Sequence, residues 1–312
     1  MRSRLPISLV VAGLMAATAP AWAGSWVAVP SVSGSTQTSV FGITDKNIIT
    51  GDYTDSSGVQ HGFVGPIDGS NDKSFDDPDG TTQPRAINDM GWISGFDSLS
   101  TATWERSPAG KLKPVTKSGT ALDGVAQGLN ASGVFGADYI DPNTGATVAY
   151  LGKKYKYMSK FKLSISNSGY AARGVDAAGD IAGWYYDPST QLQHGFIIIN
   201  GKAKTIDYPN ATYTVMEGLN DNGIVPCQYE DTSGVIHGCY YDVSTKKIKS
   251  LDVPGSTLTQ IWGANDKDVI AASATVGGVG VSYVYCIHTK GCPTAGALHQ
   301  MLRGSPPRPA QP

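Results

Sequence analysis

Charged side chains are scarce in this sequence, at 16% of 312 residues against about 25% in a typical soluble domain. The formal net charge is −2, which excludes a protein that binds nucleic acid through bulk positive charge. Apolar residues still make up 40%, enough to bury a core, so a mainly disordered chain is also excluded. Glycine (38 residues) and proline (18) are abundant instead. Together with many Tyr, Thr, Ser and Val, they indicate an all-β protein with many turns.

Long apolar runs are also lacking, apart from one near the N-terminus. Arg2 and Arg4 precede an uncharged apolar run that ends near residue 17, and small residues follow at positions 21 and 23. This layout is typical of a secretory signal peptide. The alternative, a transmembrane anchor, would need about 20 apolar residues. We therefore predict a signal peptide over residues 1–23, cleavage near Ala23, and a secreted or periplasmic protein that is not inserted in a membrane.

Cysteines are few and even in number: Cys227, Cys239, Cys286 and Cys292. In an exported chain an even number favours disulfides. Three pairings are possible, and the short local spacings favour Cys227–Cys239 and Cys286–Cys292. Free buried thiols are the alternative, and a zinc site is less favoured because there is no close CxxC pair.

One short phrase recurs six times along the chain. It joins a small residue, an apolar residue and two mostly polar residues, and its copies begin at Gly42, Ala86, Gly128, Gly174, Gly218 and Gly263. The intervals are 44, 42, 46, 44 and 45 residues. Each copy continues with a tight turn, a β run, a polar loop, a second β run and a last run that often ends in proline. Each unit therefore predicts four strands, here called a to d in chain order.

Four strands per repeat of this length are typical of a β-propeller blade, and six repeats predict a six-bladed propeller. Closure into a ring removes the bare end sheets. The sixth copy has no strand d after residues 281–286, whereas residues 25–30 have the pattern of one. We predict that this N-terminal strand completes the last blade and that the propeller spans residues 24–293. The Pro-rich tail, 294–312, is predicted to be disordered.

A comparison of copies four and five gives a further expectation. Cys227 and Cys239 lie 12 residues apart, as do Trp184 and Phe196 in the preceding copy. We therefore expect a disulfide in one blade to replace an aromatic cross-strand pair in the other.

The order Gly-Ile-Asn-Asp-x-Gly, Ile-x-Gly-x-Tyr, His-Gly-Phe and Leu-Asp-x-Pro-Gly resembles the repeat of the bacterial extracellular HAF-repeat family. The triplet is His61-Gly62-Phe63 in copy one and His194-Gly195-Phe196 in copy four. The resemblance extends over residues 26–286, is specific in copies one, four and five, and is degenerate in copies two and three. It implies a secreted, propeller-like repeat protein. The family has no agreed activity and no catalytic motif to transfer.

The face formed by the d–a connections and the b–c loops is the variable one. The residue before the recurring glycine or alanine is, in order, Phe41, Arg85, Gln127, Arg173, Glu217 and Trp262. Because strand a is innermost, we expect these six to form a ring around the channel mouth. Arginine grips carboxylates with two hydrogen bonds, and aromatic rings stack on sugars. The ring is thus a candidate carbohydrate or carboxylate site; the alternative is a solvated mouth with pairs such as Arg173–Glu217.

Histidines and acidic loops are not expected to be catalytic. His61, His194 and His237 share one repeat position, which favours an architectural role with the ring bonded to backbone or aspartate. The acidic b–c loops fit turn chemistry: the Asp141-Pro142-Asn143-Thr144-Gly145 loop lacks the bidentate Glu of a calcium loop. The sequence holds no phosphate loop and no nucleophile elbow. We therefore predict no cofactor and no metal.

Two classes of function stay open. The first is an exported propeller that binds a glycan, peptide or protein partner on the variable face. The second is an enzyme that degrades extracellular polysaccharide. A lyase would use Arg85 or Arg173 to neutralise a uronate carboxylate, and a hydrolase would use Glu217 as one of two carboxylates. A structural surface protein without a small ligand is a third option. Binding accounts best for an uneven ring without a catalytic motif.

Overall fold

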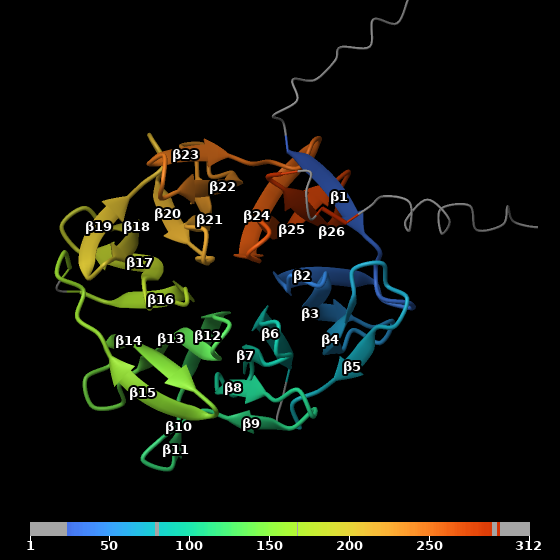
Figure 1. Cartoon of the computed structure of the whole chain (residues 1–312), viewed down its shortest axis with the longest axis horizontal. Coiled ribbons are helices and arrows are strands. Elements are labelled where there is room, and N and C mark those ends of the chain that lie inside the picture. The colour runs from blue at the N-terminus through green and yellow to red at the C-terminus, as the bar shows by residue number, and fades with distance from the viewer. Residues whose placement is uncertain (1–23, 79–80, 167, 289–291, 294–312) are drawn as a thin grey trace, which may run out of the picture.

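The computed structural model describes residues 24–78, 81–166, 168–288, 292 and 293. The predicted signal peptide and Pro-rich tail lie outside these residues. All regular structure in the described ranges is β-strand, arranged as six sheets around a central channel (Figure 1). Within the same ranges, the structure has no helix of the length and apolar character that a membrane span needs. The predicted all-β, six-bladed propeller is confirmed.

Each blade holds strands a to d from the channel outward, and all consecutive pairs are antiparallel. The first three blades comprise β2 (Gln37–Ile43), β3 (Ile48–Thr54), β4 (Gln60–Pro66), β5 (Lys73–Phe75); β6 (Thr82–Ile87), β7 (Ile93–Asp97), β8 (Thr103–Arg106), β9 (Leu112–Pro114); and β12 (Gly124–Leu129), β13 (Val134–Ile140), β14 (Thr147–Lys153), β15 (Lys156–Lys160). The last three comprise β16 (Tyr170–Val175), β17 (Ile181–Asp187), β18 (Leu192–Ile199), β19 (Lys202–Ile206); β20 (Tyr213–Met216), β21 (Ile224–Glu230), β22 (Ile236–Asp242), β23 (Lys247–Ser250); and β24 (Ser256–Ala264), β25 (Val269–Val276), β26 (Val279–Cys286), β1 (Ser25–Val29).

The N-terminal strand closes the ring, as predicted. β1 pairs antiparallel with β26 over its whole length and supplies strand d of the sixth blade (Figure 1). The Trp26 ring lies 5.0 Å from the ring of Tyr285 and 6.0 Å from that of Tyr283. Val27 and Val29 are buried in a cluster with residues of the first blade. Closure therefore joins the two ends of the described chain through hydrogen bonds and apolar packing.

Both favoured disulfides are present, Cys227–Cys239 and Cys286–Cys292. The expected equivalence with an aromatic pair is wrong in one member. Cys227 lies directly opposite Cys239 in the ladder, whereas Phe196 lies opposite Gly183, and Trp184 opposite Gly195. The residue equivalent to Cys227 is therefore Gly183, because cross-strand partners must match in register. Disulfides of this kind fit a compartment outside the reducing cytoplasm.

The recurring glycine allows the innermost strands of neighbouring blades to touch. A Cβ on Gly128 would lie 2.3 Å from the Arg173 carbonyl oxygen, and one on Gly174 would lie 2.4 Å from the carbonyl carbon of Gly218. Both contacts are with backbone atoms, which cannot rotate away. Glycine is therefore needed here for close approach of backbones.

The recurring asparagine joins the blades. The side-chain amides of Asn88, Asn130, Asn220 and Asn265 each donate to the carbonyl of the corresponding residue in the next blade, at 2.7–3.0 Å. Thr44 and Asp176 stand at this position in the other two blades and have no amide. There the following backbone N–H donates instead, from Asp45 to Asp89 Oδ1 and from Ala177 to Asp221 Oδ1, both at 2.8 Å. Every seam between blades is thus hydrogen-bonded at this level.

Blade three carries an addition that the repeat pattern did not predict. Residues between blades two and three form a small hairpin, β10 (Thr116–Lys117) and β11 (Thr120–Ala121). β10 pairs in parallel with the outer strand β15, with Thr116 opposite Lys156. Blade three therefore becomes a six-stranded sheet whose outer rim projects beyond the other blades (Figure 1).

Candidate functional site

The six predicted ring residues come together inside the channel. In five blades the residue lies at a break of register in strand a, a β-bulge, two residues before the strand ends. A bulged residue has no cross-strand partner, so its side chain is free to turn toward the channel. In the fifth blade Glu217 directly follows β20. The ring therefore lies deeper than the channel mouth where we expected it, and Phe41, Gln127 and Glu217 are buried rather than solvated.

A second ring surrounds the first and was missed in the sequence. Its members each lie 11 residues after a ring residue, on strand b: Asp52, Phe96, Asp138, Trp184, Gln228 and Ser273. Their types share no property, so only the constant interval marks them. Four of these residues contact the inner-ring residue of their own blade: Phe96, Trp184, Gln228 and Ser273. Asp138 instead contacts Arg173 of the next blade.

One half of the double ring is a chain of polar contacts. Arg173 Nη1 donates to Gln127 Oε1 at 3.1 Å and lies 3.3 Å from Asp138 Oδ1. Gln127 Nε2 and Gln228 Nε2 each donate to one oxygen of the Glu217 carboxylate, at 2.5 Å. The expected pair Arg173–Glu217 is therefore bridged by Gln127 rather than direct. Most polar atoms of this half bond one another; Gln228 Oε1 is buried without a hydrogen-bond partner, and Asp138 Oδ1 has only its ion pair with Arg173.

The other half is an aromatic cage around Arg85. The guanidinium carbon lies 4.4 Å from the Phe41 ring centroid, 4.9 Å from that of Trp262 and 5.1 Å from that of Phe96. Cation–π contacts of this kind hold the group in place. One nitrogen, Nη2, donates to Gln83 Oε1 at 3.0 Å. The Nε and Nη1 atoms are buried without a hydrogen-bond partner.

Burial shifts the pKa values around the cage. It lowers the pKa of Arg85 to about 10, while the charges of Asp52 and Glu217 act in the opposite direction. It raises the pKa of Asp52 to about 6, against the lowering effect of Arg85 and of a hydrogen bond from Gln60. At neutral pH Arg85 is therefore protonated and Asp52 is mostly ionised.

The cavity beside the ring is small. It is lined by Arg85, Gln127, Glu217 and Trp262 and, in five of the six blades, by the recurring small residue and the apolar residue that follows it. Its volume is about 40 Å³, which suits one carboxylate group or a few waters. A whole sugar ring does not fit, so a larger ligand would keep its body outside.

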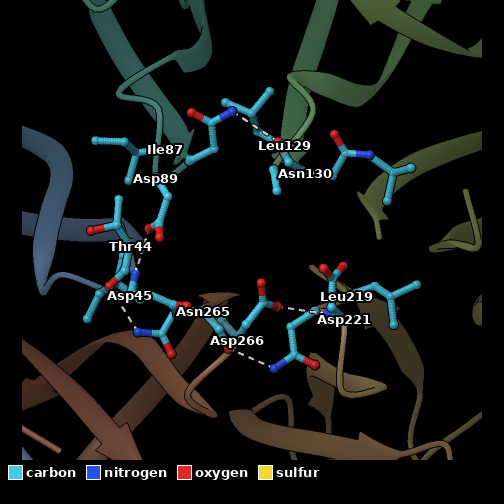
Figure 2. A pocket seen from close by; sticks show the side chains of 16 residues that line it. Thr44, Asp45, Ile87, Asp89, Leu129, Asn130, Leu219, Asp221, Asn265 and Asp266 are labelled. Atoms are coloured by element: carbon cyan, nitrogen blue, oxygen red, sulfur yellow. Dashed lines mark hydrogen bonds between the residues drawn. The ribbon is translucent and has the colours of Figure 1, made fainter. Parts of the chain in front are cut away.

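The opposite end of the channel is acidic. Asp45, Asp89, Asp221 and Asp266 surround the opening there (Figure 2). Burial raises the pKa of Asp266, and the charges of the other three add to this. Three of the four, Asp89, Asp221 and Asp266, already accept hydrogen bonds from a neighbouring blade. In the described ranges no three His, Cys, Asp or Glu side chains are grouped so as to hold a metal ion.

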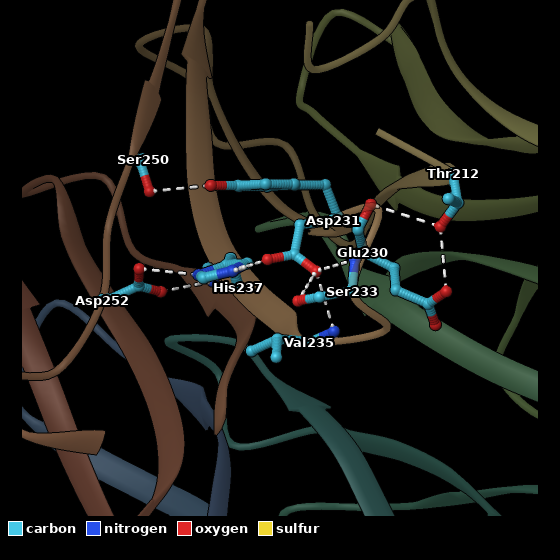
Figure 3. A network of polar contacts seen from close by, with 10 residues as sticks. Thr212, Glu230, Asp231, Ser233, Val235, His237, Ser250 and Asp252 are labelled. Carbon is cyan, nitrogen blue, oxygen red and sulfur yellow. Dashed lines mark hydrogen bonds and ion pairs between the residues drawn. The ribbon is translucent and has the colours of Figure 1, made fainter. Parts of the chain in front are cut away.

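The repeated histidines tie loops together, and the expected bond to aspartate is confirmed. His237 Nδ1 lies 2.9 Å from Asp252, and its Nε2 lies 3.2 Å from Asp231 (Figure 3). The same histidine of blades one and four bonds Asp76 and Asp207. Burial lowers the pKa of His237, but its hydrogen bonds to the two aspartates outweigh this and raise it. These contacts join the b–c loop to the segment after strand d, which is an architectural role.

Comparison with protein-family models finds no match, and comparison with curated protein sequences finds none. Solved structures do match. TolB from Acinetobacter baumannii superposes with a TM-score of 0.53 at 12% identity, over 77% of this chain and 63% of its own. This chain thus spans less than two thirds of that protein.

Two further structures cover this chain more fully. A gluconolactonase from Xanthomonas campestris has a TM-score of 0.50 at 11% identity, over 84% of this chain and 89% of its own. A catalytically inactive virginiamycin B lyase from Staphylococcus aureus, solved with quinupristin, has a TM-score of 0.50 at 12% identity, over 84% and 99%. Identities this low show a shared propeller fold and nothing about activity.

Proposed function

We propose that this protein is an exported binding module that takes one carboxylate group of an extracellular glycan, peptide or protein partner into its channel at Arg85. The observation that carries the proposal is the pair of buried, unpartnered donors, Nε and Nη1, on a side chain that lines the cavity. Buried donors are nearly always paired in folded proteins, and leaving them unpaired is costly. A ligand that accepts from them would recover that cost.

The cage favours a carboxylate over other acceptors. A guanidinium presents adjacent N–H groups in a planar fork that matches the two oxygens of a carboxylate. The aromatic rings of Phe41 and Trp262 hold this fork in one orientation, which reduces the entropy lost on binding. The cavity volume of about 40 Å³ admits the group alone. The rest of the partner would therefore rest on the d–a and b–c loops, whose sequences differ from blade to blade.

The test follows the side-chain Nε–H signal of Arg85 by NMR. Glucuronate and a short peptide with a free C-terminus are titrated as two separate probes, with methyl glucuronate ester and the amidated peptide as neutral counterparts. We expect at least one acid to shift the signal and its neutral counterpart to leave it unchanged. The Arg85→Gln variant assigns the signal and should weaken binding at least tenfold.

Arg106→Gln is the matched control. Arg106 is also in blade two, also lies over an aromatic ring (Phe75, at 4.5 Å), but is not among the residues that line the channel cavity. Its loss should leave affinity within twofold of the parent. Equal affinity in the parent and the Arg85 variant would overturn the proposal. Turnover of a uronate polymer that requires Arg85 would favour a polysaccharide-degrading enzyme instead.

Export is part of the proposal and has its own test. It is supported by the leader-like N-terminus and the two disulfides. N-terminal sequencing of protein recovered from the periplasm or the culture medium should begin at Gly24. Recovery of the uncleaved chain from the cytoplasm would contradict it.

A further inference from the structure

Basic residues are concentrated in one segment of this acidic chain. Residues 106–162 contain nine Lys or Arg and three Asp, a formal charge of +6, whereas the whole chain has −2. The remainder therefore carries −8. Seven of the eight lysines in the segment are exposed, and none takes part in an ion pair of the described residues. This charge is uncompensated and faces solvent.

The fold gathers these lysines on one stretch of the rim. The segment around β9 and β10 runs beside the start of β15, because Thr116 pairs with Lys156 (Figure 1). Tyr155 Oη donates to the Lys111 carbonyl at 3.1 Å, and Lys113 Nζ lies 5.6 Å from the Tyr155 ring centroid. Residues 111–117 and 153–162 thus form one basic surface across blades two and three.

A groove lies in the middle of this surface. It is formed by the β10–β11 hairpin on one side and β15 on the other, and it is lined by Lys117, Lys156, Tyr157 and the hairpin turn. Its volume of about 430 Å³ falls in the range of sites that hold small molecules or sugar units. Unlike the channel cavity, it has room for a whole pyranose ring.

The Lys117 ammonium is positioned in advance. It donates to Tyr139 Oη at 2.9 Å and lies 4.8 Å from the Tyr157 ring centroid. An ammonium has three donors, so two remain for a ligand. Asp141 is the acidic side chain whose charge acts on it, and it lies in the adjoining b–c loop. A lysine held over aromatic rings binds an anion with less loss of side-chain freedom than a free one.

Protection of an exposed edge accounts for only part of these lysines. Outer strands often carry lysine, which blocks pairing with other chains. Here β19 carries Lys202 and Lys204, and β23 carries Lys247 and Lys249. Two lysines per strand are therefore enough for this purpose. β15 itself also carries two, Lys156 and Lys160. Within three residues of its ends there are three more, at positions 153, 154 and 162, and the hairpin adds Lys117, whereas β19 has no such flanking lysine and β23 has one, Lys246.

We propose that the groove between the β10–β11 hairpin and β15 is a second binding site, for a segment of an acidic polysaccharide. The five residues of β15 extend for about 16 Å, which suits an extended polymer better than a small anion. The two disulfides fit a location outside the reducing cytoplasm, where acidic glycans are common polyanions. The site is separate from Arg85 and does not depend on the function proposed above.

The test compares two variants with equal loss of charge. One carries Lys117→Gln, Lys154→Gln, Lys156→Gln and Lys160→Gln. The control carries Lys202→Gln, Lys204→Gln, Lys247→Gln and Lys249→Gln, which are lysines on outer strands of other blades. Binding to immobilised polygalacturonate is measured at 50 and 200 mM salt, and thermal melts verify that both variants fold.

The parent should bind polygalacturonate, and its affinity should fall several-fold at the higher salt concentration because counterions compete. The first variant should lose at least tenfold in affinity and the control less than twofold. Equal losses in the two variants, or no loss in either, would overturn the site. Tighter binding of a DNA duplex or of phosphatidylglycerol vesicles through the same lysines would show that the ligand of the site is not an acidic polysaccharide. The fourfold variant at Lys117, Lys154, Lys156 and Lys160 should leave the response of the Arg85 Nε–H signal to glucuronate unchanged, so this result and the channel experiment fail independently.

Discussion

The two ends of the central channel are built from the same repeat but follow different rules. At the turn end, asparagine occupies the seam position in four of six blades and donates each time to a backbone carbonyl of the next blade. At the ring, the six equivalent positions hold five different residue types, and their partners are side chains. Residue identity is mostly the same in the six blades where the side chain bonds to backbone. It varies where the side chain contacts other side chains.

The difference has a physical reason. A backbone carbonyl is the same group in every blade, so one side-chain type can serve each seam, and asparagine does so at four of the six. Around the cavity each side chain meets a different neighbour, and no single residue type is required. The ring end is therefore where a binding preference can develop without opening the propeller. Variants at the two ends should differ accordingly, in stability at one and in binding at the other.

The largest effect is expected for Asn220→Ala at the turn end. The Asn220 amide donates to the Asn265 carbonyl at 2.7 Å and to Asp268 Oδ1 at 2.8 Å, and its oxygen accepts from Ile224 N–H at 2.8 Å. Each lost bond is worth about 1 kcal/mol, and buried partners are left unpaired. The free energy of unfolding should fall by about 3–4 kcal/mol in urea denaturation.

The matched variant at the ring end is Gln127→Ala. Gln127 is equally buried and bonds both Arg173 and Glu217. Water can replace its amide in the adjoining cavity, and Arg173 keeps Asp138. The loss in unfolding free energy should be about 1 kcal/mol. Similar losses for the two variants would contradict the distinction between a structural and a variable end.

The next prediction compares the loss of stability when either of two recurring glycines, Gly128 or Gly218, is replaced by alanine. Gly128→Ala should destabilise by about 2–3 kcal/mol, because its Cβ would lie 2.3 Å from the Arg173 carbonyl oxygen and the backbone must move. Gly218→Ala should cost less than about 0.5 kcal/mol, since its closest contact is 3.2 Å and blade two already has Ala86 there. Thermal melts of the pair are a direct measurement. Equal melting temperatures would show that the blades shift freely against one another.

Much of the fold was predictable because the six copies of the repeat can be compared with one another. Equivalent residues occupy equivalent places, so the interval near 44 residues fixed the blade number, the ring and the role of β1. The β10–β11 hairpin was not predictable. It lies in the shortest interval, 42 residues, because β7 and β8 have only five and four residues, against seven each in β3 and β4, which offsets the residues that the hairpin uses. Length alone therefore conceals an insertion.

The site was predicted in part. Equivalent positions in the six repeats identified the inner ring. Its depth could not be predicted, because the β-bulge that turns Arg85 inward depends on local strand geometry rather than on composition. The second ring, which includes Asp52 and Gln228, had only the interval of 11 residues as a signal. Unpaired donors on Arg85 cannot be inferred from sequence, since they depend on which neighbours reach the guanidinium.

The last effect on stability concerns Asp52, and it depends on pH. Burial raises its pKa from 3.8 to about 6 despite Arg85, Gln60 and Ser39 nearby. The folded state therefore holds the proton more tightly than the unfolded state. The stability that this provides is complete below pH 4 and is lost as the pH rises through 6. Asp52→Asn removes the ionisation, so the variant should match the parent at pH 4 and exceed it by about 2 kcal/mol at pH 8.

Asp187→Asn is the control of opposite sign. Hydrogen bonds from Ser189 lower the pKa of this exposed aspartate, so its contribution is present above the unfolded pKa and is lost as the pH falls. Urea denaturation at pH 4, 6 and 8 should therefore give curves that diverge upward for Asp52→Asn and not for Asp187→Asn. Parallel profiles for Asp52→Asn and the parent would contradict the shift. Divergence would show that the ring end keeps an ionised aspartate beside Arg85 at a cost to folding, as expected where a site is maintained for binding rather than for stability.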